Sequence, residues 1–379
     1  MRIGLNARLL ASADQRGVNR YAAELARALA HAGAEVILFS DAPVHPTHGL
    51  YGLERVRVIA SYERPRWKWQ HGWLPHALAA EKVEVFHAPA NWGVPWHSLC
   101  PVVATIHHLA DRELPAGFAR WSLRARLRHR IEQRIVVRRS PRLITVSEYT
   151  ARSIGRFLGV PSERIAVTAP GAASAFEQPP TVSQARAIAD RRGLIGPYFI
   201  HVGGFESRKN LELIVHALVA LDPRDRMPVA LVGARGPDAE AVAGLARAAG
   251  VERLLPQLGV IADAELAGLY ACAAAVIVPS RLEGFALSVV EAMHVGTPAI
   301  VSSAGALPEI AGDAGIVVGP DDPAALAAAM RSLASDTATR DVLAAKARAR
   351  ASRFTWRAAA EQTMAVYEAI VKEAGTKPG

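Results

Sequence analysis

A regular alternation of short apolar runs with segments of helical periodicity constrains the fold of this chain most strongly. Runs at Arg2–Asn6 and Glu35–Ser40 flank Gly17–His31, where apolar residues recur every three to four positions. Strand–helix–strand repetition of this kind predicts an α/β protein with doubly wound parallel sheets. Further strands are expected at Val56–Ile59, Val83–His87, Val102–His107, Leu143–Val146, Ile165–Thr168, Tyr198–Val202, Val229–Val232, Ala275–Val278, Ala299–Val301 and Ile316–Val318.

One interruption of this alternation divides the chain. The stretch Gly171–Arg192 is small, polar and proline-containing, which predicts a linker. With 379 residues, 51% of them hydrophobic, the chain is long enough for two domains. We expect a first Rossmann-like domain over residues 1–172, a second over 173–353 and a closing helix over 354–379. Open parallel sheets bind ligands at the carboxyl ends of their strands, so a cleft between two such domains is the expected site.

The two halves differ in charge. Residues 1–172 contain 24 lysines and arginines against 13 acidic residues, whereas the remainder contains 20 against 22. Residues 120–142 hold nine arginines and one acid, and apolar residues recur there every four positions from Leu123 to Ile135. Residues 64–75 mix three tryptophans with three cations. A basic, tryptophan-rich half therefore has partners different from those of the near-neutral half.

Three interpretations are compatible with these basic segments. Tryptophan with arginine is typical of contact with an anionic membrane surface or a lipid diphosphate. Alternatively, the apolar stripe is core and the arginines are only solvated. Nucleic acid is the third interpretation, and it would leave the sites described below unexplained.

Several other classes of protein are not expected. No apolar run is long enough for a transmembrane helix, and the first residues do not resemble a signal peptide. Cys100 and Cys272 give neither a disulfide framework nor a metal spacing. These features favour the reducing cytoplasm.

Two carboxylates flank the start of a predicted helix near residue 287. An apolar strand ends at Pro279, Glu283 and Gly284 follow in a loop, and the helix runs through Glu291. Backbone N–H groups at a helix start suit a phosphate, and a glycine lets the ligand approach the backbone. Carboxylates there can accept hydrogen bonds from vicinal sugar hydroxyls. The alternative is that Glu283 caps the helix and Glu291 is solvated or paired.

A second strand–loop–helix unit carries adjacent cations. In residues 201–210 (HVGGFESRKN), Arg208 and Lys209 lie at the junction of loop and helix. The helix dipole disfavours cations at this end, so a bound anion would explain their placement. The alternative is two solvated charges.

The first half offers weaker candidates. Gly17 opens a helix after the first strand, but no G-x-G-x-x-G dinucleotide fingerprint is present. His107 and His108 end a predicted strand, and His107 is expected to donate to a sugar hydroxyl or phosphate oxygen, with a structural role as the alternative. No carboxylate or cysteine lies at ligand spacing from this pair, so no metal site is predicted.

Taken together, these segments resemble the retaining glycosyltransferases of family 4, which have the two-domain GT-B fold. The chain contains an E-x7-E motif from Glu283 to Glu291 and a G-x-x-x-R-K-N loop from Gly204 to Asn210. The resemblance covers nearly the whole chain. Supporting matches are GVNRY, TIHHL, VSEYT at Val146–Thr150, GTPAIVSSAGALPEIAGDAG at Gly296–Gly315 and FTWRAAAEQTMAVYEAI at Phe354–Ile370, the last resembling the family's helix that crosses back to the first domain.

The resemblance implies roles for particular residues. Arg208 and Lys209 would hold the donor's diphosphate, Glu283 the sugar hydroxyls and Glu291 the ribose. Catalysis would be metal-independent, with no cofactor besides the nucleotide sugar, because the two cations neutralise the leaving group. The remaining donor contacts would come from Gly17, Gly204, Gly284, the N–H groups of Phe285, Ala286 and Leu287, and the backbone of Val260, with His107 near the reacting centre.

The closest general likeness is to mannosyl- and rhamnosyltransferases of surface polysaccharide assembly, lipopolysaccharide included. This implies transfer of a hexose or deoxyhexose from a GDP-sugar, with UDP-sugars next, to a lipid-linked or oligosaccharide acceptor. The enzyme would be cytoplasmic and peripheral at the inner face of the membrane, with no nucleic-acid partner. Ala286 and Ser288 replace the glycine and proline usual in relatives, which bears on the donor sugar. The alternatives are a sugar-nucleotide epimerase of the same architecture and a non-catalytic membrane- or RNA-binding protein.

Overall fold

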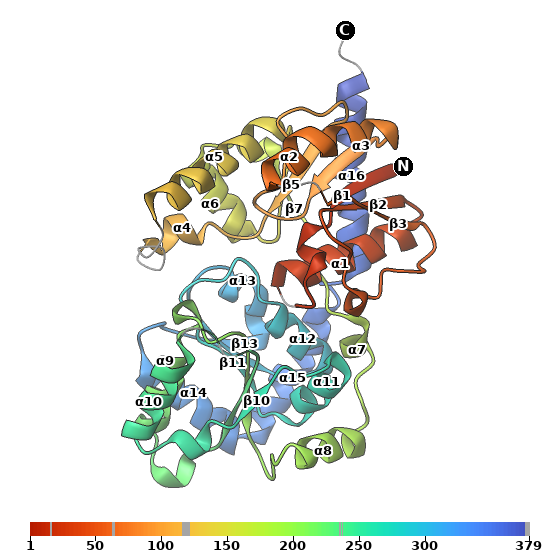
Figure 1. Cartoon of the computed structure of the whole chain (residues 1–379). Coiled ribbons are helices and arrows are strands. Elements are labelled where there is room, and N and C mark those ends of the chain that lie inside the picture. The colour runs from red at the N-terminus through yellow and green to blue at the C-terminus, as the bar shows by residue number, and fades with distance from the viewer. Residues whose placement is uncertain (16, 63–64, 116–121, 235, 237, 376–379) are drawn as a thin grey trace. The chain divides into compact units, whose positions relative to one another are not determined.

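The chain folds into two compact units (Figure 1). The computed structural model describes residues 1–15, 17–62, 65–115, 122–234, 236 and 238–375. One unit comprises Met1–Gly171 with Thr355–Gly379, and the other comprises Ala172–Phe354. Each boundary lies one residue from the position expected from the sequence. Both units contain an all-parallel sheet covered by helices, so the predicted α/β architecture of two doubly wound domains is confirmed.

The first unit is built on a seven-stranded sheet of order β3-β2-β1-β4-β5-β6-β7. Strand order reverses between β1 and β4, which is the position where such sheets form their ligand crevice. The strands are β1 (Arg2–Asn6), β2 (Glu35–Ser40), β3 (Val56–Ala60), β4 (Val85–Ala88), β5 (Val102–Ile106), β6 (Leu143–Thr145) and β7 (Ile165–Val167).

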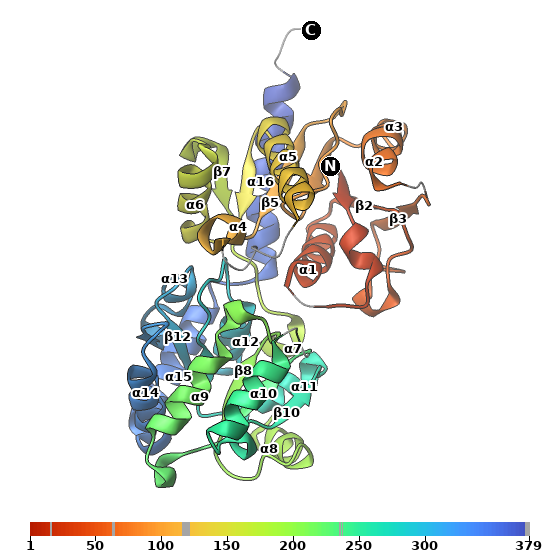
Figure 2. The ribbon, with the colours of Figure 1, turned by 60° about the vertical axis from the view of Figure 1, so that its left-hand side comes forward.

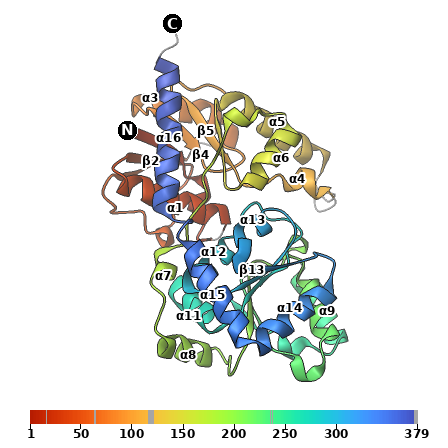
Figure 3. The same cartoon turned by 180° about the vertical axis from the view of Figure 1, so that it is seen from behind.

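Helices cover both faces of this sheet (Figures 1 and 3). Trp69, Leu74 and Val136 pack on one face against Phe39 and Phe86 of the strands. On the other face α1 packs against α16, which comes from the end of the chain. A π-helical turn joins α2 to α3. The helices are α1 (Gly17–His31), α2 (Arg66–Lys68), α3 (Leu74–Ala80), α4 (Ala110–Glu113), α5 (Leu123–Arg139), α6 (Glu148–Leu158) and α16 (Trp356–Gly375).

The second unit has a six-stranded sheet of order β10-β9-β8-β11-β12-β13, again with one reversal, between β8 and β11. Its strands are β8 (Phe199–Val202), β9 (Val229–Val232), β10 (Gln257–Gly259), β11 (Val276–Val278), β12 (Ala299–Ser302) and β13 (Gly315–Val318). Its helices are α7 (Ser174–Glu177), α8 (Val182–Arg191), α9 (Leu211–Ala220), α10 (Ala239–Ala248), α11 (Asp263–Cys272), α12 (Leu287–Val295), α13 (Leu307–Ala311), α14 (Pro323–Ser335) and α15 (Thr337–Ala351).

The predicted linker over 171–192 is wrong for most of its length. Helices α7 and α8 form there, and α8 packs against α11. A capping box between Thr181 and Gln184 starts α8. Ile188 then lies so close to Gly268 of α11 that a Cβ at Gly268 would be 2.5 Å from Ile188 Cδ1. Helix α8 is thus packed against the second unit rather than being a flexible linker.

Candidate functional site

Two loops meet at the carboxyl edge of the second sheet. The loop after β8 carries Arg208 and Lys209, and the loop after β11 carries Glu283. Because β8 and β11 are neighbours in the sheet, the two loops emerge side by side. The N–H of Arg281 donates to the carbonyl oxygen of Arg208 over 2.8 Å and joins them. The order of the strands in the sheet therefore brings the two sequence motifs together.

The side chains at this junction form a carboxylate–cation cluster, defined here as Glu283, Lys209, Arg208 and Ser280. Lys209 Nζ lies 2.7 Å from Glu283 Oε1, and Arg208 Nη1 lies 3.0 Å from Glu283 Oε2. The Ser280 hydroxyl donates to Oε1 over 2.8 Å. Burial acts to raise the pKa of Glu283, but the charges of Lys209 and Arg208 outweigh it and lower the pKa to about 2. The carboxylate is therefore ionised at neutral pH.

Both cations remain accessible from outside the cluster. The Lys209 side chain is 18% exposed and the Arg208 side chain 23%, while Glu283 is 12% exposed. The Arg208 guanidinium also donates to the Leu282 carbonyl oxygen, which fixes its orientation. Two oriented cations beside one carboxylate suit a ligand with an anionic part and a hydroxyl-bearing part.

Left-handed backbone conformations and hydrogen bonds to backbone carbonyl oxygens hold the two loops in place. Asn210 adopts a left-handed conformation, with φ of 57°, and its amide donates to the carbonyl oxygens of Pro279 and Pro320. Gly305, with φ of 64°, approaches the other loop so closely that a Cβ there would lie 2.4 Å from the Glu283 carbonyl oxygen. The N–H of Ala306 donates to that same oxygen over 2.8 Å. Neither Asn210 nor Gly305 had a predicted role, although both lie in segments that carried the resemblance.

A buried histidine beside the cluster was also missed. His201 lies on β8, and its Nδ1–H donates to the Ile277 carbonyl oxygen over 2.9 Å. Its Nε2 has no hydrogen-bond partner among the described residues and is the nearest atom to a Cβ built at Gly203, with Lys209 Cε next. Burial lowers the pKa of His201 to about 4, so the ring is neutral and Nε2 is an acceptor beside Lys209. In the sequence, only the position of His201 on a predicted strand could have indicated a role at this site.

Glu291 lies about one turn into the site helix. The helix α12 begins at Leu287, and no side chain of the described residues caps its amino end at Ala286. Glu291 is buried, and the hydroxyl of Tyr270 lies 3.4 Å from its Oε2. The loop between Glu283 and this helix contains Gly284 and Phe285, and the Phe285 ring packs edge-on against Phe354. The alternative in which Glu283 caps the helix is therefore wrong, because its carboxylate is held by Ser280, Lys209 and Arg208. For Glu291 the solvated alternative is wrong, whereas its contact with Tyr270 agrees with the paired one.

The other predicted donor residues of this unit lie on the same loops or near them. Gly204 follows β8, where a Cβ would contact only the Glu206 side chain at 3.3 Å. Val260 follows β10 directly and is 69% exposed. Since β10 is two strands from β8, Val260 lies at the same carboxyl edge but beyond β9.

Gly17 and His107 belong to the first unit. Gly17 opens α1 with φ of 52°. His107 follows β5, and its Nε2–H donates to the Pro89 carbonyl oxygen over 3.0 Å. Burial lowers the pKa of His107 to about 4, so the ring is neutral. Its remaining ring nitrogen, Nδ1, is an acceptor, and the expectation that the His107 side chain donates to the ligand is corrected accordingly.

The apolar stripe of the basic helix α5, which one interpretation assigned to the core, faces solvent. Leu123, Leu127 and Ile131 are 82%, 60% and 45% exposed, whereas Gln133 and Val136 are its buried positions. The interpretation of this apolar stripe as core is therefore wrong up to Ile131. Arg64, Arg120 and Trp121 of the basic segments lie outside the described residues.

The residues that the structure describes lack two kinds of feature. In that part of the chain, no three histidine, cysteine, aspartate or glutamate side chains are grouped to hold a metal ion. Within the same ranges, no helix combines the length and apolar character needed to cross a membrane.

Comparison with known proteins finds two families along the chain. The family described as Glycosyltransferase Family 4 matches residues 15–174, and Glycosyl transferases group 1 matches residues 193–350. The chain is 30% identical over 298 residues to the O-antigen chain mannosyltransferase B of Escherichia coli, covering 78% of this chain and 76% of that protein. It is 30% identical over 389 residues to a D-inositol 3-phosphate glycosyltransferase of Xylanimonas cellulosilytica, covering 95% and 93%. The Anabaena protein Alr3699/HepE in complex with UDP and glucose has a similar fold, with a TM-score of 0.80, 18% identity and coverage of 97% and 100%.

Proposed function

This chain belongs to the GT-B glycosyltransferases of family 4 and group 1, and we propose that it is a retaining, metal-independent hexosyltransferase of surface polysaccharide synthesis. It transfers a hexose or deoxyhexose, mannose first, from a nucleoside diphosphate sugar to a lipid-linked or oligosaccharide acceptor. The observation that carries the proposal is the cluster of Glu283 with Lys209 and Arg208 at the carboxyl edge of the second sheet.

The cations and the carboxylate of the cluster are suited to bind different parts of the donor. Lys209 and Arg208 bind the donor's diphosphate and stabilise the negative charge that develops on it as the bond to the sugar breaks. Glu283 accepts hydrogen bonds from sugar hydroxyls and so orients the ring. No cofactor takes part, because the two cations supply the charge that a divalent ion would otherwise provide.

The low pKa of Glu283 favours one route for the proton. A carboxylate with a pKa of about 2 is a weak base and a weak nucleophile. We therefore assign the acceptor's proton to the leaving phosphate. The acceptor oxygen bonds to the anomeric carbon on the face from which the phosphate oxygen departs, and the electron pair of the broken bond stays with the diphosphate. Attack from this face retains the configuration.

For the nucleotide base of the donor we propose guanine first and uracil as the second choice. The mannosyltransferase named among the relatives supports a mannose-type sugar, and the UDP in the Anabaena complex supports the second choice. Thermal-shift titration with GDP, UDP, CMP and dTDP, with and without EDTA, tests both base and metal dependence. We expect one diphosphate to stabilise the chain, EDTA to have no effect and Lys209→Ala to abolish the shift.

Arg281→Ala is the matched control for this titration. It removes a cation from the neighbouring loop, but Arg281 pairs with Asp321 rather than with Glu283. The control should keep the nucleotide-induced shift. Absence of a shift with every nucleotide at millimolar concentration would contradict the proposal.

The product tests the reaction class. Nuclear magnetic resonance of the product should show the anomeric configuration of the donor sugar. An inverted product would contradict retention, and consumption of the nucleotide sugar to give only an epimer would favour the epimerase.

The proposed place of the enzyme is the inner face of the cytoplasmic membrane. The exposed stripe of Leu123, Leu127 and Ile131 lies on a helix rich in arginine, which suits the interface of an anionic bilayer. The membrane contact is peripheral, and nucleic acid is not a partner.

A further inference from the structure

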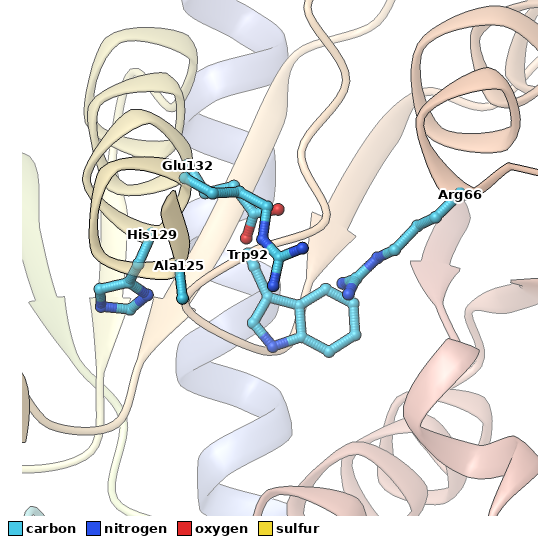
Figure 4. Close-up of a pocket in the computed structure, with 6 residues that line it drawn as sticks. Arg66, Trp92, Ala125, His129 and Glu132 are labelled. Carbon is cyan, nitrogen blue, oxygen red and sulfur yellow. The ribbon is translucent and has the colours of Figure 1, made fainter. Parts of the chain in front are cut away.

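A pocket in the first unit shares no residue with the carboxylate–cation cluster. It lies between α2, the segment after β4 and α5, and has a volume of about 220 Å³. Figure 4 shows Arg66, Trp92 and Glu132 converging on it from these three elements. We call it the arginine pocket, and its lining residues are Arg66, Trp92, Ala125, Arg128, His129 and Glu132.

Arg66 is poorly neutralised within this pocket. Its guanidinium lies 4.2 Å from the centre of the Trp92 ring, and it forms no ion pair with any described residue. Burial and the nearby charge of Arg8 lower its pKa, and Arg128 adds to the effect, while Glu132 and Asp41 oppose it. Arg66 is an exposed cation with Arg8 and Arg128 as well as two carboxylates near it, and an anion that enters the pocket would pair with it directly.

Arg8 adds a second incompletely satisfied cation. Its side chain is 10% exposed, and its guanidinium lies 5.7 Å from the Trp92 ring centre. Nη2 pairs with Asp41 at 2.7 Å, but Nε and Nη1 are buried without a hydrogen-bond partner among the described residues. Arg8 does not line the arginine pocket, but its positive charge lies next to Trp92 and favours an anion there.

We propose that the arginine pocket binds a phosphate or diphosphate ester group of the acceptor, which deepens the proposed function and rests on it. Arg66 and Arg128 contact the phosphate oxygens, and Trp92 holds Arg66 by its ring face. Glu132, four residues from Arg128 on the same helix, accepts from a hydroxyl next to the phosphate.

The size of the pocket limits the ligand. Sites for drug-sized molecules measure roughly 300–1,000 Å³, so a pocket of about 220 Å³ takes one polar group rather than a whole nucleotide sugar. The donor cluster belongs to the second unit and the arginine pocket to the first. The two anion sites therefore share no residue.

The helix α5 connects the pocket with a membrane surface. Ala125, Arg128, His129 and Glu132 of this helix line the pocket, whereas Leu127 and its neighbours in the stripe are exposed. A helix resting on a bilayer by that stripe holds its arginines at the depth of lipid phosphates. This arrangement suits a lipid-linked phosphate, and a soluble phosphorylated glycan presents the same chemistry.

Calorimetric titration tests the proposal with two probes, inorganic pyrophosphate and farnesyl diphosphate. The full chain carries Lys209→Ala, so that the donor loop contributes less to binding of either probe. We expect Arg66→Ala and Arg128→Ala each to weaken binding about tenfold, as loss of one charge-assisted contact does. Equal affinity for the two probes identifies the phosphate alone as the ligand group, and tighter binding of farnesyl diphosphate identifies a lipid-linked source.

Arg130→Ala is the matched control, because Arg130 is exposed on the same helix and does not line the pocket. It should change the affinity less than about twofold. Equal losses in all three variants would mean general surface electrostatics and would overturn the proposal, as would failure of both probes to bind. Thermal unfolding of each variant checks that it is folded, and quenching of tryptophan fluorescence that is lost in Trp92→Phe gives a second readout.

The outcomes separate this inference from the proposed function. If no nucleoside diphosphate stabilises the chain while pyrophosphate binding still depends on Arg66 and Arg128, the donor chemistry fails and the anion site stands. If a nucleotide binds but neither probe does, the transferase stands and the pocket proposal fails.

Discussion

Glu283 carries its negative charge in a largely buried position, between Lys209 at 2.7 Å and Arg208 at 3.0 Å. These partners lower its pKa from 4.5 to about 2. The ion pairs therefore contribute stability that is complete above pH 4.5 and is lost as the pH falls through about 2. A shift of this size corresponds to about 3 kcal/mol.

We predict that Glu283→Gln lowers the free energy of unfolding of the ligand-free chain by about 3 kcal/mol at pH 7. The difference from the native chain should shrink as the pH approaches 2, because the native carboxylate is then also neutral. Urea unfolding at several pH values measures it. Glu206→Gln is the control, since Glu206 also pairs with Arg208, at 3.2 Å, but is 53% exposed. Similar losses in the two variants would argue against a special role of the buried carboxylate.

His107 leads to a second residue-scale prediction. Its pKa is lowered to about 4 by burial, so the ring is neutral throughout pH 5.5–8 and acts through Nδ1 as an acceptor. His107→Ala should reduce kcat/KM for nucleotide-sugar consumption about tenfold through loss of one hydrogen bond. The ratio of native to variant should stay constant across that pH range. A ratio that changes near pH 6.5 would mean that the ring titrates in the site.

At the scale of elements, the close approach of Gly305 to the Glu283 loop sets the shape of the site. Gly305 has φ of 64°, and a Cβ there would lie 2.4 Å from the Glu283 carbonyl oxygen. Gly250 has a similar φ of 69°, with nothing within 4 Å of its Cβ position. Gly250→Ala therefore adds only left-handed strain, about 1 kcal/mol, whereas Gly305→Ala adds strain and a backbone clash.

We predict that Gly305→Ala abolishes nucleotide-induced stabilisation and lowers the unfolding temperature more than Gly250→Ala does. The control should keep the nucleotide-induced shift, because Gly250 lies after α10 and touches neither loop. Differential scanning fluorimetry with and without the preferred diphosphate makes both measurements. Retention of the full shift in Gly305→Ala would show that the two loops tolerate displacement.

The stripe on α5 gives the second element-scale prediction. Leu127 is 60% exposed, so Leu127→Asp should leave folding intact while placing a negative charge at the proposed lipid interface. We expect several-fold weaker co-sedimentation with vesicles containing anionic lipid. Val342→Asp is the control, because Val342 is similarly exposed on α15 of the other unit. Equal loss with both variants would point to a general charge effect.

The sequence predicted some elements and missed others for identifiable reasons. Apolar runs marked β8 and β11 because both are buried, but β10 was missed because Gln257–Gly259 is short and largely exposed at the sheet edge. Periodicity predicted α5 as a helix and left open which side faces the core. That choice depends on where Val136 packs against the sheet, which is a tertiary contact.

The candidate site was predictable as two motifs and not as one cluster. Glu283, Arg208 and Lys209 stood out by residue type at loop–helix junctions. Their contacts of 2.7 and 3.0 Å follow from the adjacency of β8 and β11, which no local pattern encodes. Asn210 and Gly305 act through the backbone conformation of one loop against another, and this too becomes visible only in the folded chain.

At the scale of the whole molecule, the first unit is discontinuous, because the chain leaves it at Gly171 and returns at Thr355. Tyr367 of α16 is fully buried in that unit, and its hydroxyl lies 2.5 Å from Nδ1 of His87, which in turn contacts Thr105. The last helix therefore completes the core that the first residues begin. Loss of its packing should destabilise the first unit without altering the second.

We predict that Tyr367→Ala increases amide hydrogen exchange in β1, β4, β5 and α1 and leaves β8 to β13 unchanged. Removing a buried aromatic side chain costs about 3–5 kcal/mol, a large fraction of the stability of one domain. The nucleotide-induced shift of the second unit should persist. Glu368→Ala, at the exposed neighbouring position, should change neither measurement. Faster exchange in both sheets of the Tyr367 variant would instead mean that the two units unfold as one cooperative body.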